Sequence, residues 1–309
     1  MAGTLRRFAG AHPERGSVTI ILVFSLTAIL GLAALSVDVA RLHLARQRVA
    51  AVADAAALSG AQFLPDDRVG AVAAVREYLG KNGVNPDAMV INVNEAQRTL
   101  TVTVEARVTY TFARVLGKNA DFVRAGAVAR IAPLSGSDRV VPLGVVQADW
   151  QLGDPVTLKA GSNVGHLSPG NYGALALGGS GANSYENNLQ NGYTGWIRVG
   201  DWLRTEPGNM AEPTRRALQS RISQDPFVTF QTVRKQSPRI VIIPVLESFT
   251  VNGRGEVKCV GFGAFFLESV GDQGNDRGTV HGRFLRYVVT GEAGGDTPDF
   301  ATYTIKLTH

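Results

Sequence analysis

The stretch RGSVTIILVFSLTAILGLAALSVDVAR, from Arg15 to Arg41, has no charged side chain between Ser17 and Val37. These residues, about 21 of them, can cross the roughly 30 Å hydrocarbon core of a bilayer as an α-helix that rises about 1.5 Å per residue. A secretory signal peptide has a shorter apolar region, about 7–15 residues long, followed by a small-residue cleavage site. The stretch therefore predicts a retained transmembrane helix over residues 17–37, with a cleaved signal peptide as the alternative.

The same helix is expected to continue beyond the membrane. No proline follows Val37 until Pro65, and the sequence between them is rich in alanine, the residue with the highest helix propensity. We expect one helix from about Ser17 to about Gln62, within an emergent alanine-rich segment over residues 38–64. Spacings of three, four or seven relate Ala40, Leu44, Ala51, Ala55 and Leu58. Such a stripe predicts a face that packs on the protein's own next domain or on a partner helix.

The charges around the span do not orient it. Three arginines lie on each side, which are Arg6, Arg7 and Arg15 before it and Arg41, Arg46 and Arg48 after it. The positive-inside rule therefore gives a tie, and it does not choose the side that receives the C-terminal part.

Composition narrows the class of protein. The 309 residues leave room for one large or two modest domains, and 45% hydrophobic residues can build a core. The net charge is +5, but no basic run interleaved with aromatic residues follows the first fifty residues, which argues against nucleic-acid binding. The single cysteine, Cys259, excludes an internal disulfide framework and every metal site built on a cysteine pair.

The N-terminal region resembles a known family over about residues 14–62. Arg15-Gly16-Ser17, the apolar span, Asp38 directly after it and the run ADAAAL (Ala53 to Leu58) are together similar to the TadE/TadG-like region of TadG-like proteins, a Tad/Flp pilus-assembly family. The resemblance implies a non-enzymatic, single-pass protein of the bacterial cytoplasmic membrane. Residues 1–16 would lie in the cytoplasm and the C-terminal bulk outside, and the protein would act in assembly or anchoring of a surface appendage.

The same resemblance suggests partners. Ser17 to Val37 would contact the lipid bilayer, and other Tad/Flp pilus-assembly membrane proteins would bind the chain. Neither a nucleic acid nor a small-molecule substrate is expected. Two alternatives stay open, a membrane-anchored extracytoplasmic hydrolase and a minor pilin cleaved after Gly16. Type IV pilins usually carry Glu at the fifth mature position, where this chain has Ile21. Otherwise Gly16 would open the helix, with Ser17 as its N-cap.

After the long helix, residues 65–132 predict a small α+β module. A short helix is expected over residues 66–80, capped by Asp66 or Asp67. Residues 90–94, 100–112 and 122–131 are expected to be strands, and residues 100–112 alternate apolar and polar side chains as a half-buried antiparallel strand does. Residues 133–142, PLSGSDRVVP, are typical of a linker.

The remainder, residues 143–309, predicts a mostly β extracytoplasmic domain, sandwich-like or barrel-like, so the chain as a whole is expected to be α+β. One helix is expected over residues 213–224, with Asn209 as a possible cap, and a glycine-rich excursion over residues 165–195. Strands are expected at residues 155–159, 195–199, 239–249, 256–267, 282–290 and 299–307.

Candidate catalytic and phosphate-binding residues form only fragments of known sites. His166 lies near Ser162 and Ser168, but the chain has neither the Gly-x-Ser-x-Gly nucleophile elbow nor an HExxH zinc motif. Asp201 and Glu206 could act as a carboxylate pair, or simply flank a turn. The run Leu177–Gly195 has the glycines of a phosphate-binding loop without its Gly-Lys-Ser/Thr ending, so a structural loop is favoured.

Three further features have a functional and a structural interpretation. Asp272, Asn275 and Asp276 supply oxygen ligands without the EF-hand spacing, so a hairpin turn is favoured over a calcium site. Cys259 is expected to be a buried residue instead of a nucleophile, and His12, His43, His281 and His309 are dispersed. A contact surface could be formed by Tyr172, Tyr185, Tyr193 and Trp196. From the sequence we assign no catalytic, cofactor-binding or metal-binding residue.

Overall fold

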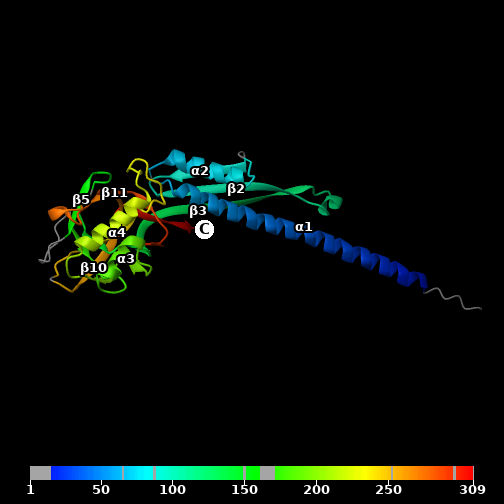
Figure 1. Cartoon of the computed structure of the whole chain (residues 1–309). Helices are drawn as coiled ribbons and strands as arrows, with labels where there is room; N and C mark the ends of the chain where they lie inside the picture. Colours follow the sequence, from blue (N-terminus) through cyan, green and yellow to red (C-terminus); the bar gives the residue numbers. More distant parts are fainter. Residues whose placement is uncertain are drawn as a thin grey trace, which may run out of the picture. The chain divides into compact units, whose positions relative to one another are not determined.

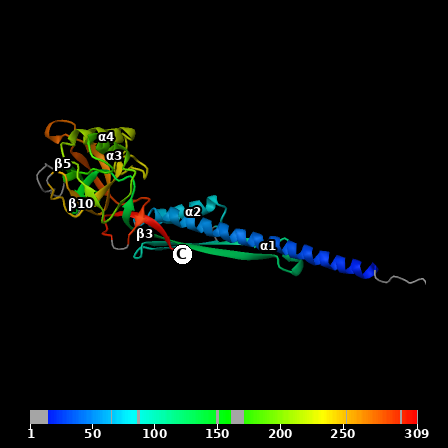
Figure 2. The same cartoon turned by 90° about the horizontal axis from the view of Figure 1, so that it is seen from below.

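The computed structural model describes residues 15–64, 66–85, 88–148, 151–160, 171–251, 253–294 and 297–308 (Figures 1 and 2). The chain divides into two compact units. The first unit comprises Met1–Gly60, Val72–Asn92 and Thr101–Val128, and the second comprises Ala61–Ala71, Val93–Leu100 and Ala129–His309. The predicted α+β class is confirmed: a long N-terminal helix precedes small helix and sheet elements, and the C-terminal region is mostly β.

A single helix, α1 (Arg15–Ala61, 47 residues), opens the chain and confirms the predicted continuous helix. Because α1 begins at Arg15, Ser17 lies inside it, and the expected N-cap role of Ser17 is wrong. The remaining elements that belong to the first unit in whole or in part are α2 (Arg68–Lys81), β1 (Met89–Asn94), β2 (Thr99–Thr109), the 3-10 helix η2 (Ala113–Leu116) and β3 (Ala120–Ser137).

The helix α2 and the three strands after it follow their sequence patterns. The Asp67 carboxylate accepts the N–H of Gly70 at 2.7 Å, which confirms the expected cap of α2. β2 lies between β1 and β3 in the sheet, and its residues Val102 and Val104 are buried while Arg107 is exposed. Alternate side chains of β2 thus face the core, as a period of two requires.

The second unit contains most of the sheet structure. Its further elements, in chain order, are β4 (Leu143–Val146), β5 (Val156–Ala160), β6 (Asn171–Ala174), α3 (Ala182–Asn191), β7 (Ile197–Arg198), β8 (Trp202–Arg204), α4 (Ala211–Gln224), β9 (Ile240–Leu246), β10 (Glu256–Val270), the 3-10 helix η3 (Gly274–Asp276), β11 (Val280–Leu285), β12 (Tyr287–Val288), β13 (Glu292–Ala293) and β14 (Thr302–Thr308).

Six strands of the second unit form a closed ring, the barrel-like one of the two expected β architectures, while β7, β12, β13 and β14 belong to another sheet. The order in the ring is β11-β5-β6-β4-β9-β10, and β10 pairs back with β11, so the ring closes, with β8 attached to β10. Val241, Ile243 and Val245 of β9 join one core cluster, and Ile242 and Leu246 join another. α3 and α4 add Tyr185, Leu189, Ala217 and Leu218 to the first of these clusters.

The expected linker at residues 133–142 is wrong. Residues up to Ser137 complete β3, and Val140 and Val141 are fully buried. Val140 bridges two segments, pairing with Tyr193 and with Ile242. The glycine that suggests a linker has a packing role, since a Cβ on Gly136 would lie 2.9 Å from the Glu292 carboxylate.

The glycine-rich excursion also differs from the expectation. Within Leu177–Gly195 the chain forms α3, a helix of 10 residues that buries Tyr185 and Leu189 on one face. Asparagine and glycine have low helix propensity, so the sequence favours a loop, and burial of the two apolar side chains one turn apart outweighs that preference. β4, β6, β8 and β13 are further elements without a sequence-based prediction.

Candidate functional site

The N-terminal half of α1 is exposed and apolar. Over an 18-residue window the helix reaches a mean hydropathy of 2.6, and none of that window is buried. The hydroxyls of Thr27 and Ser36 donate to the carbonyls of Val23 and Leu32, each at 2.8 Å, so these polar atoms are satisfied within the helix. Such a segment can lie in lipid without leaving a hydrogen-bonding group unpaired at those positions. Among the described residues, α1 is the one helix long and apolar enough to cross a membrane.

The emergent half of α1 buries a different face from the predicted one. Ala40, Leu44 and Ala51 are exposed, so packing of the stripe on the protein's own next domain is wrong at these positions, while Ala55 and Leu58 are partly buried. Packing of the exposed positions on a partner helix stays a prediction. The positions of α1 that are buried within the first unit are Asp38, Val49, Ala53, Ala56, Ala57 and Gly60, with Leu42 and Ala45 partly buried. Residues of this face line, with Val104–Val108 of β2, a groove of about 530 Å³. Small side chains let the helix approach the sheet closely.

Asp38 is the buried charged residue of this face, and it is 1% exposed. One carboxylate oxygen accepts the N–H of Thr111 at 2.8 Å. The other accepts the N–H groups of Phe112 and Ala113 at 2.8 and 2.7 Å. Arg41, one turn further along α1, donates to the hydroxyl of Thr111. Asp38 thus satisfies the backbone donors at the start of η2, as an N-capping residue does, although it is distant in the sequence.

The local structure around η2 differs from the prediction. A strand was expected up to Phe112, but β2 ends at Thr109 and the 3-10 helix η2 follows. Gly117 then adopts a left-handed conformation with φ of 82°, and its N–H bonds to the carbonyl of Arg114 at 3.0 Å. Sequence reasoning missed this contact of Asp38. Its one signal is the position of a lone acid directly after an uncharged span.

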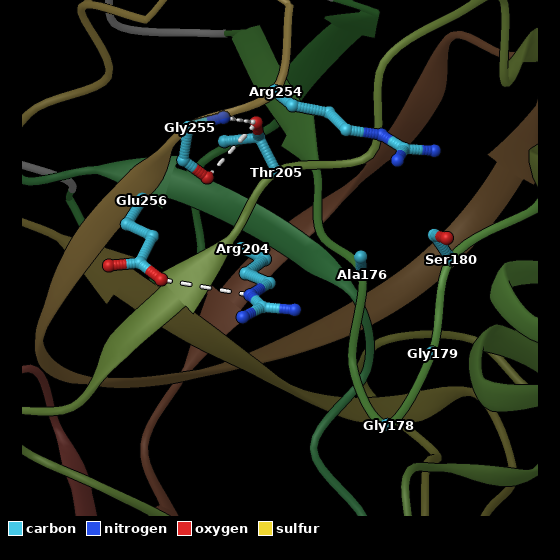
Figure 3. A pocket seen from close by; sticks show the side chains of 9 residues that line it. All are labelled: Ala176, Gly178, Gly179, Ser180, Arg204, Thr205, Arg254, Gly255 and Glu256. Carbon is cyan, nitrogen blue, oxygen red and sulfur yellow. Dashed lines mark hydrogen bonds and ion pairs between the residues drawn. The ribbon is translucent and has the colours of Figure 1, made fainter.

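A second candidate lies in the second unit, where a hollow of about 550 Å³ opens beside β8 (Figure 3). Arg204 and Arg254 line it, and Glu256 is 3.7 Å from the Arg204 guanidinium. The Thr205 hydroxyl is bound to the backbone, donating to the carbonyl of Gly253 at 2.8 Å. Gly178, Gly179 and Ser180 form another part of the wall. The hollow could take an anionic or polar group, but the described residues that line it include no histidine or cysteine to act as a base or nucleophile.

Asp201 and Glu206, the expected carboxylate pair, bind different backbone N–H groups in the structure. Asp201 accepts the N–H of Arg198 at 2.8 Å and closes the turn between β7 and β8. Glu206 is buried and accepts the N–H of Gly181 at 2.8 Å, directly before α3. Both acids therefore hold backbone groups. His166, Ser162 and Ser168 lie outside the described residues, so their arrangement is not part of the structure described.

The expected turn at residues 271–278 is present. Asp272 pairs with Arg215 at 3.0 Å, and Asp276 lies 3.7 Å from His281. The side chain of Asn275 is outside the described part. No group of three or more His, Cys, Asp or Glu side chains among the described residues could hold a metal ion.

Cys259 and the dispersed histidines have structural surroundings where they are described. Cys259 is fully buried, which raises the pKa of its thiol to about 12, and the thiol donates to the carbonyl of Gly261 at 3.4 Å. His43 contacts Gln47 at 3.0 Å, and His281 contacts Thr157 at 3.1 Å. His12 and His309 lie outside the described residues.

The expected aromatic surface is only partly exposed. Tyr185 is buried and its hydroxyl bonds to Thr214 at 2.9 Å, Tyr193 is partly buried, and Trp196 is 47% exposed with Arg198 over its ring. The side chain of Tyr172 is outside the description. The expected cap of α4 by Asn209 is wrong, because the N-cap of α4 is Met210, which makes no side-chain cap hydrogen bond. The Asn209 amide oxygen, one residue earlier, accepts the N–H of Ala211 at 3.0 Å.

Comparison with protein-family models gives a match to the N-terminal part of the chain. The model of the Tad family, a TadE/G-like Flp pilus-assembly domain, matches residues 16–62. The matched residues lie almost entirely within α1 (Arg15–Ala61) and include the exposed apolar half, Asp38 and the buried alanine face. No curated protein and no solved structure matches the chain.

Proposed function

We propose that the protein is a non-enzymatic, single-pass protein of the bacterial cytoplasmic membrane that acts in assembly or anchoring of a Flp-type pilus. The observation that carries this proposal is the coincidence of the matched segment with α1. The match supports a pilus-related role, and the exposed apolar half of the helix fits a membrane protein. Residues 17–37 would contact lipid, and partner proteins of the same assembly would bind the parts outside the bilayer.

The proposed topology places residues 1–16 in the cytoplasm and everything after Val37 outside. In this arrangement the small α+β module and the β barrel act as spacer and contact surface in the cell envelope. The absence of catalysis is likewise part of the proposal. It is supported by the use of Asp201 and Glu206, the candidate acids, to bind backbone N–H groups.

Deletion of the gene in its native bacterium tests the role. Cells without the protein should lose most of their Flp-type pili in electron micrographs, and the full chain supplied from a plasmid should restore them. A truncated chain that starts after the span, led outside by a cleavable signal, should not restore them, because the anchor is missing. Normal piliation of the deletion strain would contradict the proposal.

The minor-pilin alternative has its own measurement. The peptide bond between Gly16 and Ser17 lies in the first turn of α1. Mass spectrometry of the N-terminal peptide from purified membranes should find it intact. A mature chain that starts at Ser17 would support the minor pilin instead.

A further inference from the structure

The β2–β3 hairpin ends in an exposed apolar tip. We define the η2 tip as residues 110–119, which connect β2 to β3 through η2. Val115 is 90% exposed, Leu116 77% and Phe112 45%. Three large apolar side chains on one short turn are costly in water, and a clustered exposed patch of this kind usually marks a contact.

Asp38 fixes where this tip lies within the first unit. The apolar segment of α1 ends at Val37, and the next residue accepts the N–H groups of Thr111, Phe112 and Ala113. Figures 1 and 2 both show the end of the hairpin beside α1, at the point from which the N-terminal half of the helix extends alone. The tip therefore lies at the level where the apolar segment of α1 ends.

Most backbone N–H groups of the η2 tip have a hydrogen-bond acceptor within the protein, although a loop exposed to water could bond to water instead. Besides the three N–H groups bound by Asp38, the N–H of Tyr110 bonds to Asn119 and that of Val115 to Phe112. Gly117 and Lys118 donate to Arg114 and Ala113 at 3.0 and 3.1 Å. Such pairing lowers the cost of moving a segment toward hydrocarbon, where an unpaired backbone group is expensive.

The charges of the tip suit a lipid surface. Arg114 and Lys118 are both exposed and flank the apolar residues. Long basic side chains can keep their stems in the apolar region and their charged ends among headgroups. The nearby acid, Asp121, is engaged by the hydroxyl of Tyr110 at 3.3 Å and by the N–H of Phe122 at 2.8 Å. Apolar residues flanked by cations are the pattern of segments that lie in the interface of anionic membranes.

We propose that the η2 tip is a second membrane contact, in which Phe112, Val115 and Leu116 enter the lipid interface while Arg114 and Lys118 bind anionic headgroups. The proposal rests on membrane anchoring by α1. Because the anchor already holds the tip at the bilayer, the effective concentration of lipid is high, and a small apolar patch suffices. The two contacts together would restrict the tilt and rotation of the emergent half of α1 about the span.

Spin labelling of the full chain in vesicles of phosphatidylcholine and phosphatidylglycerol tests the contact. Cys259 is the single cysteine and fully buried, so an introduced cysteine can be labelled selectively. Nitroxides at Val115→Cys and Leu116→Cys should collide more often with dissolved oxygen than with a water-soluble nickel chelate. Ile29→Cys, within the span, serves as the lipid control. Val90→Cys, 65% exposed on β1, serves as the water control, because β1 pairs with β2 many residues from the tip.

The outcomes separate this proposal from the anchor itself. Nitroxides at positions 115 and 116 that behave like the one at position 90, while position 29 stays in lipid, would overturn the tip contact and leave the anchor intact. Water exposure at position 29 would overturn both. Replacement of Arg114 and Lys118 by Glu should move the nitroxide at position 115 toward water in the anionic vesicles and far less in phosphatidylcholine alone. Arg76→Glu, an exposed change on α2, should leave that nitroxide unchanged, and equal loss in both lipids would contradict the headgroup role.

Discussion

Asp38 accepts the backbone N–H of Ala113 at 2.7 Å across 75 residues of sequence. Asp38 follows the apolar segment of α1 directly, and Ala113 is the first residue of η2 at the end of the β2–β3 hairpin. Because the same carboxylate also binds Thr111 and Phe112, three backbone donors depend on one buried side chain. The hairpin end is thereby fixed to the helix at the edge of the proposed membrane span.

Asp38→Ala should loosen this end of the first unit. Loss of the carboxylate leaves three backbone donors without their acceptor, at a cost of about 1–3 kcal/mol after partial solvation by water. Hydrogen exchange of a peptide that covers residues 110–118 should become faster in detergent-solubilised protein. Asp54→Ala, a change of the same kind at a half-buried position of α1, should leave exchange of that peptide unaltered. Equal protection in Asp38→Ala and the parent chain would contradict the capping role.

The buried face of α1 can be tested by a matched pair of alanines. Ala53 is fully buried and Ala51 is exposed. Ala53→Leu should lower the free energy of unfolding by about 1–3 kcal/mol, because extra methylene groups overpack a close helix–sheet contact. Ala51→Leu should change it by less than about 0.5 kcal/mol. Denaturant unfolding in detergent compares the two, and an equal effect would show that the face is assigned wrongly.

Residue spacing alone does not identify the buried face of α1. In an alanine-rich helix nearly every face contains small residues, so spacing alone favours Ala40, Leu44 and Ala51 as readily as the true face. The decisive residue is Asp38, whose burial follows from donors that come from η2. A partner so distant in the sequence leaves no local signal. The span itself, in contrast, follows from composition alone, since lipid requires about 20 apolar residues.

In the second unit, too, some helices and turns depend on contacts that are distant in the sequence and leave no local pattern. β9 and β10 are long runs rich in apolar residues, which predict strands, and they form as expected. α3 has no such local signal, because asparagine has a low helix propensity. The helix is stabilised instead by burial of Tyr185 and Leu189 in the core. The turn acids Asp201 and Glu206 have sequence surroundings that fit either a catalytic or a structural role. In the structure each carboxylate accepts a backbone N–H, which supports the structural role.

Arg239 should be among the most important polar residues of the barrel. Arg239 is 5% exposed, and its guanidinium lies over the ring of Phe266 and donates to the carbonyls of Leu267, Glu268, Val228 and Asp225. Arg239→Ala removes these donors from buried carbonyls and should lower the free energy of unfolding by about 3 kcal/mol. Arg234→Ala, at an exposed position of the same segment, should cost less than about 0.5 kcal/mol. Thermal unfolding of the two variants side by side would contradict this account if their midpoints matched.

Asp299 should make stability depend on acid pH. Burial alone would raise the pKa of its carboxyl, but the N–H of Ala301, the Arg98 guanidinium at 2.7 Å and the Tyr303 hydroxyl outweigh burial and hold the pKa below its usual 3.8. The folded state then binds this proton less readily than the unfolded state. The stability that Asp299 contributes is complete above the unfolded pKa and is lost as pH falls through the folded pKa.

Asp299→Asn removes that titration. On acidification from about pH 5 to about pH 2, the melting temperature of the parent chain should fall more than that of Asp299→Asn, because other carboxyl groups titrate in both. At neutral pH the variant should be the less stable of the two. Parallel curves over the whole range would show that Asp299 has an ordinary pKa.

Protease treatment of spheroplasts tests the central claim most directly, that α1 is a retained anchor with the C-terminal bulk outside. The chain, with an epitope at its C-terminus, should sediment with membranes after carbonate washing and lose the epitope when protease is added from outside. An epitope released into the soluble fraction would show that residues 17–37 are a cleaved signal. An epitope that sediments but resists protease until the membrane is broken would show the opposite orientation. Either result would contradict the proposed topology.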